Sequence, residues 1–142
     1  MSSLHDKTFS FTQRRIQLSG DIMRVLIVDD NDDAGQALLA YLLLEGINCR
    51  LAIGGSLGVD VAISWQPHVI VMDVSMPEVN GIKAAQMLRN HPFMKHVGIV
   101  AFTALDAQEV RRLMDDQEFD GYCQKGSGPT DLIALIDSFT VH

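Results

Sequence analysis

The sequence predicts an α/β fold in which a doubly wound parallel sheet of five strands is covered by five helices in three layers. Short, continuous apolar runs recur along the chain, and such runs are typical of strands buried on both faces of a sheet. Each run is followed by a segment with helical patterning, and this alternation favours a parallel sheet with helices on both faces. The expected strands cover 24–29, 48–53, 69–73, 97–102 and 119–123, and the expected helices cover 32–45, 56–65, 80–89, 106–116 and 129–139.

The boundaries of these elements follow from local residue types, in chain order. The β-branched run 24–29 ends in acids, and the helix after it stops at Gly46, a common helix C-terminal residue. Ser56 is the expected N-cap of the second helix. The run 69–73 is again apolar and again ends in an acid. Pro129 lies in the first turn of the last helix, where its missing N–H is tolerated, and this helix has one apolar face.

Length and composition indicate one globular domain. The chain has 142 residues, of which 47% are hydrophobic and 20% are charged. We expect residues 1–22 to be an N-terminal extension, either flexible or an added edge element, and 23–142 to be the domain. The alternating run 8–12 is compatible with an edge strand.

The net charge and the hydropathy limit the classes of partner that we expect. The net charge is −7, and because residues 1–22 are slightly positive, the predicted domain is clearly acidic. An acidic surface repels nucleic acid and anionic membranes, so we expect neither as a partner. No apolar run approaches the ~20 residues that span a bilayer. We therefore expect a cytoplasmic protein.

Chemically capable residues follow four of the five predicted strands. Asp29 and Asp30 end the first, Asp73 the third, Thr103 follows the fourth and Lys125 the fifth. The carboxyl ends of parallel strands meet at one edge, where ligands bind in such folds. Three neighbouring carboxylates repel one another unless a cation is present, and Mg²⁺ prefers such hard oxygen ligands. The sequence therefore predicts a Mg²⁺ site that also takes a phosphate-type ligand.

The remaining side chains suit phosphoryl transfer. Lys125 supplies a compact positive charge and Thr103 a hydrogen-bond donor for phosphoryl oxygens. Asp73 is the candidate nucleophile, since a carboxylate that attacks phosphorus forms an acyl phosphate.

Four segments carry a family resemblance: 25–30 (VLIVDD), 71–77 (VMDVSMP), 102–104 (FTA) and 122–125 (YCQK). They resemble the response regulator receiver domains (CheY-like) of two-component and phosphorelay signalling, and the resemblance runs from about residue 23 to 139. It implies a flavodoxin/CheY-like three-layer sandwich with strand order 2-1-3-4-5.

The resemblance implies a role for each matching residue. Asp73 is the phosphorylation site. Mg²⁺, which Mn²⁺ could replace, is bound by Asp29, Asp30, Asp73 and the backbone carbonyl of Ser75.

Thr103 and Lys125 contact the phosphoryl group, and Thr103 and Tyr122 form the conformational switch. A tyrosine that is partly buried at a sheet edge would also explain Tyr122 without any switch. The sequence departs from the family at Gly126, where a proline usually follows the lysine, so we expect a more flexible loop there.

The resemblance also implies the partners. A histidine kinase or histidine phosphotransfer protein would supply the phosphoryl group. A protein target would read the face made by the fourth helix, fifth strand and fifth helix. We expect no enzyme activity beyond self-phosphotransfer and self-dephosphorylation. Because the last helix lacks basic residues, we expect a monomer before phosphorylation.

Two other functions stay open. The chain would be a phosphorylation-independent adaptor if it signalled through binding alone. The run 30–33 (DNDD) also has some similarity to the nucleophile motif of haloacid-dehalogenase-like phosphatases. A calcium loop over 29–40 is excluded, because Ala34 and Ala40 stand where glycine and glutamate are required.

Overall fold

The computed structural model describes residues 7–141. Its elements, in chain order, are β1 (Thr8–Ser10), β2 (Ile16–Gln17), β3 (Arg24–Asp29), α1 (Asp32–Leu44), β4 (Asn48–Ile53), α2 (Gly55–Trp65), β5 (Val69–Met72), α3 (Gly81–Arg89), β6 (Gly98–Thr103), α4 (Ala107–Leu113), β7 (Gly121–Gln124), α5 (Pro129–Ser138) and β8 (Thr140–Val141).

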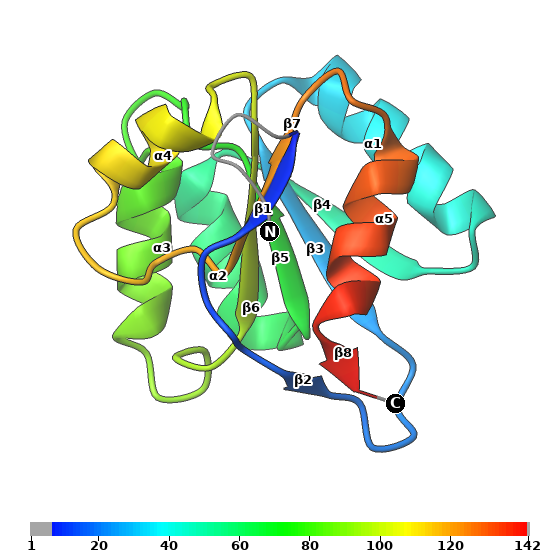
Figure 1. The fold of residues 1–142 in the computed structure, drawn as a ribbon. Coiled ribbons are helices and arrows are strands. Elements are labelled where there is room, and N and C mark those ends of the chain that lie inside the picture. The colour runs from blue at the N-terminus through cyan, green and yellow to red at the C-terminus, as the bar shows by residue number, and fades with distance from the viewer. Residues whose placement is uncertain (1–6, 142) are drawn as a thin grey trace.

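The central sheet has the order β1-β7-β6-β5-β3-β4 (Figure 1). The strands from β4 to β7 are parallel to one another, and their order confirms the predicted 2-1-3-4-5 arrangement. A sixth strand, β1, pairs antiparallel with β7 and adds an edge to the five parallel strands that were predicted. The extra strand comes from the predicted extension, whose residues 1–6 lie outside the described part of the chain.

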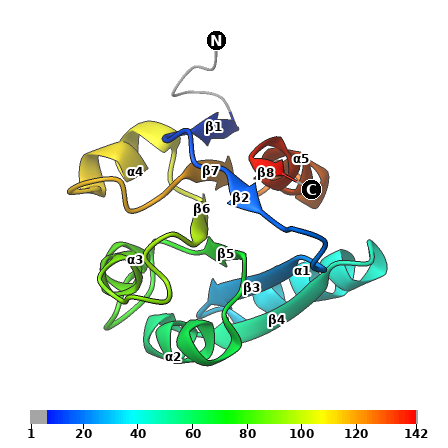
Figure 2. The same ribbon diagram turned by 90° about the horizontal axis from the view of Figure 1, so that it is seen from below.

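Helices cover both faces of the sheet. Figure 2 shows α1 and α5 on one face and α2, α3 and α4 on the other. Two buried apolar clusters fill the two interfaces, and all four residues of β5 lie within them. Burying one Leu or Ile side chain contributes about 1.5–3 kcal/mol, so these clusters dominate the stability of the fold. In the described residues no helix is both long enough and apolar enough to cross a membrane.

Local details differ from the prediction at two helices. Helix α2 begins at Gly55 with Gly54 as its N-cap, so the prediction of Ser56 as the cap was wrong. Gly54 adopts φ +105°, a backbone conformation that a side chain disfavours, and this turn starts the helix one residue earlier. Helix α4 ends at Leu113 instead of residue 116, because the backbone N–H groups of Asp115 and Asp116 donate to the Glu118 carboxylate.

Candidate functional site

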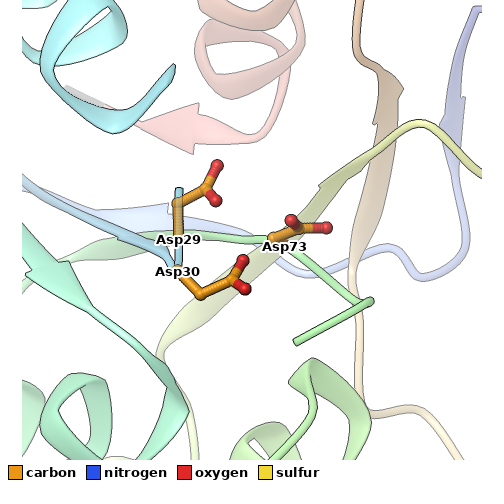
Figure 3. A group of neighbouring side chains, drawn as sticks. All are labelled: Asp29, Asp30 and Asp73. Carbon is orange, nitrogen blue, oxygen red and sulfur yellow. The ribbon is translucent and has the colours of Figure 1, made fainter. Parts of the chain in front are cut away.

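Three aspartates meet at the carboxyl edge of the sheet. Asp29 ends β3, Asp30 follows it, and Asp73 directly follows β5. Val28 and Met72 are register partners in the neighbouring strands, so the residues after them emerge side by side. One carboxylate oxygen from each aspartate lies within 4.8 Å of the others (Figure 3). Asp29 and Asp73 are buried and Asp30 is exposed, so the cluster opens to solvent on one side.

The turn into α1 orients Asp29. The side chain of Asn31 caps α1 by accepting a hydrogen bond from the N–H of Ala34 at 3.0 Å. The backbone N–H of Asn31 donates to Asp29 Oδ1 at 2.9 Å. One asparagine thus starts the helix and fixes one oxygen of a site carboxylate.

The loop after β5 orients Asp73. The N–H of Asp73 donates to the carbonyl of Val28 at 2.9 Å, which continues the ladder between β5 and β3. The N–H of Ser75 donates to Asp73 Oδ1 at 3.3 Å. Ser75 itself is exposed, and its backbone lies beside the cluster in the same loop.

Gly81 is a site residue that the sequence analysis missed. A Cβ there would collide with the backbone carbonyl oxygen of Asp73 and would lie 2.8 Å from the Cα of Val74. The N–H of Gly81 donates to the carbonyl of Val74 at 3.0 Å, and the preceding Asn80 caps α3 by accepting from Lys83 N–H. Only glycine lets the first turn of α3 approach the Asp73 loop this closely. The Asn80–Gly81 pair was the available sequence signal.

Lys125 bridges the two buried aspartates. Its Nζ lies 2.7 Å from Asp29 Oδ2 and 3.2 Å from Asp73 Oδ2. Burial acts to lower the pKa of the ammonium, but the hydrogen bond to Asp29 and the charge of Asp73 outweigh it and raise the pKa of Lys125. The ammonium therefore stays charged and offsets part of the carboxylate repulsion.

The loop that carries Lys125 has a conformation that proline cannot adopt. Gly126 has φ +95°, whereas the proline ring holds φ near −65°. The N–H of Lys125 donates to the carbonyl of Thr103 at 2.8 Å, and the Ser127 hydroxyl donates to the carbonyl of Gln124 at 2.7 Å. No peptide bond between residues 7 and 141 is cis.

Thr103 and Tyr122 are linked through the backbone of one residue. Thr103 ends β6 and is buried, and its Oγ1 accepts a hydrogen bond from the N–H of Leu105 at 3.3 Å. The hydroxyl of Tyr122 donates to the carbonyl of Leu105 at 2.7 Å. Burial, with a smaller effect from the charge of Asp106, raises the pKa of Tyr122 to about 12. The sequence analysis did not identify Leu105 as this connection.

Tyr122 is fully buried, so the interpretation of a partly buried tyrosine at the sheet edge was wrong. The reason is that β1 covers the edge of β7, which makes β7 an inner strand.

The donor set at this edge suits a hard divalent cation. The cluster offers carboxylate oxygens only, without histidine or cysteine, and it leaves one side open for water or phosphate oxygens. Asp29, Asp30 and Asp73 would hold such an ion, and the backbone carbonyl of Ser75 is the further ligand that the sequence analysis predicts.

The fold and this edge together define an α/β domain with a parallel sheet, a cluster of three aspartates at its carboxyl edge and a charged lysine beside them. Residues 25–137 match the model of the response regulator receiver domain, and the chain belongs to this family. Receiver domains act in phosphorelays, so membership supports that role for the chain.

Curated relatives are modestly similar in sequence. The chain is 30% identical to the response regulator MprA of Mycobacterium avium over 114 residues, which are 80% of this chain and 49% of MprA. It is 37% identical to the regulatory protein AtoC of Escherichia coli over 70 residues, which are 49% of this chain and 15% of AtoC. The chain thus spans half or less of these relatives.

Solved structures show the same fold. The chemotaxis protein CheY4 of Vibrio cholerae superposes with a TM-score of 0.75 at 24% identity, covering 83% of this chain and 98% of CheY4. The response regulator TrrA of Thermotoga maritima, solved in complex with Mg²⁺-BeF, gives a TM-score of 0.74 at 23% identity, covering 82% of this chain and 98% of TrrA.

Proposed function

We propose that the chain accepts a phosphoryl group on Asp73 in a Mg²⁺-dependent reaction and signals through contacts with other proteins. The observation that carries the proposal is the cluster itself. Three carboxylates approach within 4.8 Å, and the Lys125 ammonium contacts two of them. Packing alone does not explain this arrangement, because like charges that lie close together destabilise a fold unless a ligand compensates them.

The transfer requires positioning and charge neutralisation. A carboxylate oxygen of Asp73 forms the bond to phosphorus while the P–N bond of a donor phosphohistidine breaks. The electron pair of that bond leaves with the imidazole nitrogen. Bound Mg²⁺ would supply positive charge for the phosphoryl oxygens, held by Asp29, Asp30 and Asp73.

The chain's own side chains complete the charge balance. Lys125 is within reach of Asp73, so its ammonium can move from the carboxylate to a phosphoryl oxygen with little displacement. Thr103 ends the neighbouring strand, and its hydroxyl, which accepts from the Leu105 N–H, still has its own hydrogen to donate to another phosphoryl oxygen. A shift of Thr103 towards that oxygen would connect the phosphoryl group to Tyr122 through Leu105.

The donor in this proposal is a histidine kinase or histidine phosphotransfer protein, and the chain is a monomer before phosphorylation. No substrate turnover is proposed beyond self-phosphotransfer and self-dephosphorylation. TrrA, which shares the fold, was solved in complex with Mg²⁺-BeF, and this supports the proposal that the chain takes Mg²⁺ together with a phosphoryl group. The absence of a nucleic-acid partner stays a prediction, since the relative RpaA of Synechocystis is named as DNA-binding.

The test is incubation with Mg²⁺ and acetyl phosphate, followed by intact-mass spectrometry. We expect one phosphoryl group on the wild type and none on Asp73→Asn or in the presence of excess EDTA. Asp137→Asn, an exposed aspartate on α5, is the matched control and should be modified like the wild type. Equal modification of Asp73→Asn, or none of the wild type, refutes the proposal. Steady hydrolysis of a generic phosphomonoester would favour a phosphatase instead.

A further inference from the structure

An N-terminal segment, residues 8–17, crosses the molecule beside β7, and we call it the strap. It contains β1 and β2, and Figures 1 and 2 show β1 lying between α4 and α5 against β7. The face made by α4, β7 and α5 is the one that the sequence analysis assigns to a protein target. In this structure the strap covers the middle of that face.

Backbone hydrogen bonds join the strap to β7. Thr8, Phe9 and Ser10 pair with Cys123, Tyr122 and Gly121 in antiparallel register. The pairing extends beyond both ends of β1. The N–H of Gln124 donates to the carbonyl of Lys7 at 2.8 Å, and the N–H of Phe11 donates to the carbonyl of Asp120 at 2.8 Å.

A buried ion pair anchors the strap at the amino end of β7. Arg14 Nε lies 2.7 Å from Oδ1 of Asp120, whose side chain is 1% exposed. The Thr12 hydroxyl donates to the same oxygen at 2.8 Å. Past this anchor, β2 pairs in parallel with β8, so the strap is held at three separate places.

The strap reaches the proposed switch through Phe9. Phe9 is the register partner of Tyr122, and directly opposite residues in a sheet place their side chains on the same face. Both rings belong to the same apolar cluster, in which Phe9 and Phe11 pack against the buried core that contains Tyr122. The two phenylalanine ring centroids are 5.4 Å apart. The strap therefore closes the side of the sheet through which the Tyr122 ring would otherwise reach solvent.

We propose that the strap is a built-in regulatory element that holds Tyr122 in its buried position and thereby favours phosphorylation of Asp73. The inference rests on the proposed function, in which the phosphoryl group on Asp73 is linked to the buried Tyr122 through Thr103 and Leu105. Because coupling between two sites is reciprocal, a strap that favours the inward ring must bind more firmly when Asp73 carries a phosphoryl group. Phe9 is a positioning residue in this scheme and does not contact the site.

The test uses the full chain in a Tyr41→Phe background, where Tyr122 is the only tyrosine. Phe9→Ala removes the ring of the residue that pairs with Tyr122, and Arg14→Gln loosens the strap at its other anchor. Phe93→Ala, which removes an exposed phenylalanine elsewhere, is the matched control. Circular dichroism first verifies that each variant is folded.

The first measurement is the rate at which tetranitromethane nitrates Tyr122. The second is the affinity for beryllium fluoride in saturating Mg²⁺, by calorimetry. We expect Phe9→Ala and Arg14→Gln to raise the nitration rate and to weaken beryllium fluoride binding by about 5-fold or more, the usual lower range of coupling between sites. The affinity for Mg²⁺ alone and the behaviour of Phe93→Ala should not change.

The outcomes separate the two proposals. If the wild type binds no beryllium fluoride, the proposed function fails, and the nitration rate still reports whether the strap holds Tyr122. If the wild type binds it and both strap variants bind it equally well, the regulatory inference fails. Faster nitration without weaker binding would mean that the strap only covers the tyrosine, which also overturns the coupling.

Discussion

Replacement of Asp120 by alanine is expected to destabilise the fold strongly, although this residue lies at the opposite end of β7 from Lys125. Its carboxylate accepts hydrogen bonds from Arg14 Nε at 2.7 Å, from Arg89 Nη2 at 2.8 Å, from the Thr12 hydroxyl at 2.8 Å and from the N–H of Ile99 at 2.9 Å. Two of the donors are guanidinium groups with side chains only 22% and 16% exposed. Asp120 is therefore the shared counter-charge of two cations.

The magnitude follows from what the substitution leaves behind. Burial lowers the pKa of Arg89, and the nearby Asp120 charge opposes that effect, so Arg89 depends on this carboxylate for compensation. Removing one partner of a buried ion pair typically costs about 3–5 kcal/mol. Adding the energies of four separate hydrogen bonds would give a larger loss of stability. The loss is smaller because the released Arg14 side chain can turn to solvent and regain its hydration. We therefore expect the free energy of unfolding to fall by about 3–5 kcal/mol.

The assay is urea unfolding followed by far-ultraviolet circular dichroism. Asp137→Ala, an exposed aspartate on α5, is the matched control and should change stability by less than about 0.5 kcal/mol. A double-mutant cycle of Asp120→Ala with Arg14→Ala isolates the contribution of the strap anchor. A fall of less than about 1 kcal/mol in the free energy of unfolding of Asp120→Ala would show that the network contributes no more than exposed ion pairs do, and would refute the reasoning.

Three further results are expected. Lys125→Gln should slow phosphorylation by acetyl phosphate by about 100-fold, since it removes the cation beside Asp73, and an unchanged rate by intact-mass time course would contradict its role. Gly81→Ala should lower stability by about 1–3 kcal/mol in the same urea assay, because its Cβ meets the Asp73 backbone, and a neutral change would show that α3 can shift freely. Because the pKa of Tyr122 is raised from 10.0 to about 12 in the folded chain, its contribution to stability is present below pH 10 and is lost as the pH rises from 10 towards 12. Tyr122→Phe should flatten alkaline unfolding over that range, and an identical pH profile would exclude Tyr122 as its source.

The acidic site could be predicted from the sequence because each of its residues is marked by the residues next to it in the chain. Asp29, Asp30 and Asp73 each lie within one residue of a strand end, and the parallel arrangement of those strands fixes their common edge. Lys125 could be placed for the same reason. Gly81 could not, because its requirement comes from the approach of α3 to the Asp73 backbone, which no single segment reveals.

The pairing of the strap and the ion pair that anchors it could not be predicted from neighbouring residues. Arg14 and Asp120 are 106 positions apart, and Arg89 and Asp120 are 31 apart, so nothing in either neighbourhood marks them as partners. The alternation over 8–12 was compatible with a strand but did not say where it would pair. The choice of β7 depends on which edge the fold leaves open, and this is known only after the whole sheet is ordered.

The placement of β7 explains why a site and a strap so far apart in sequence would act on each other. The strand has only four residues, with Lys125 directly after it and Asp120 directly before it. Lys125 contacts the carboxylates of the site, whereas Asp120 holds Arg14 of the strap. Tyr122 lies between them. Its hydroxyl donates to the carbonyl of Leu105, and the N–H of Leu105 donates to the Thr103 hydroxyl. Because this short strand is hydrogen-bonded on both edges to β6 and β1, we expect a backbone shift at its Lys125 end to be transmitted to the strap at its other end.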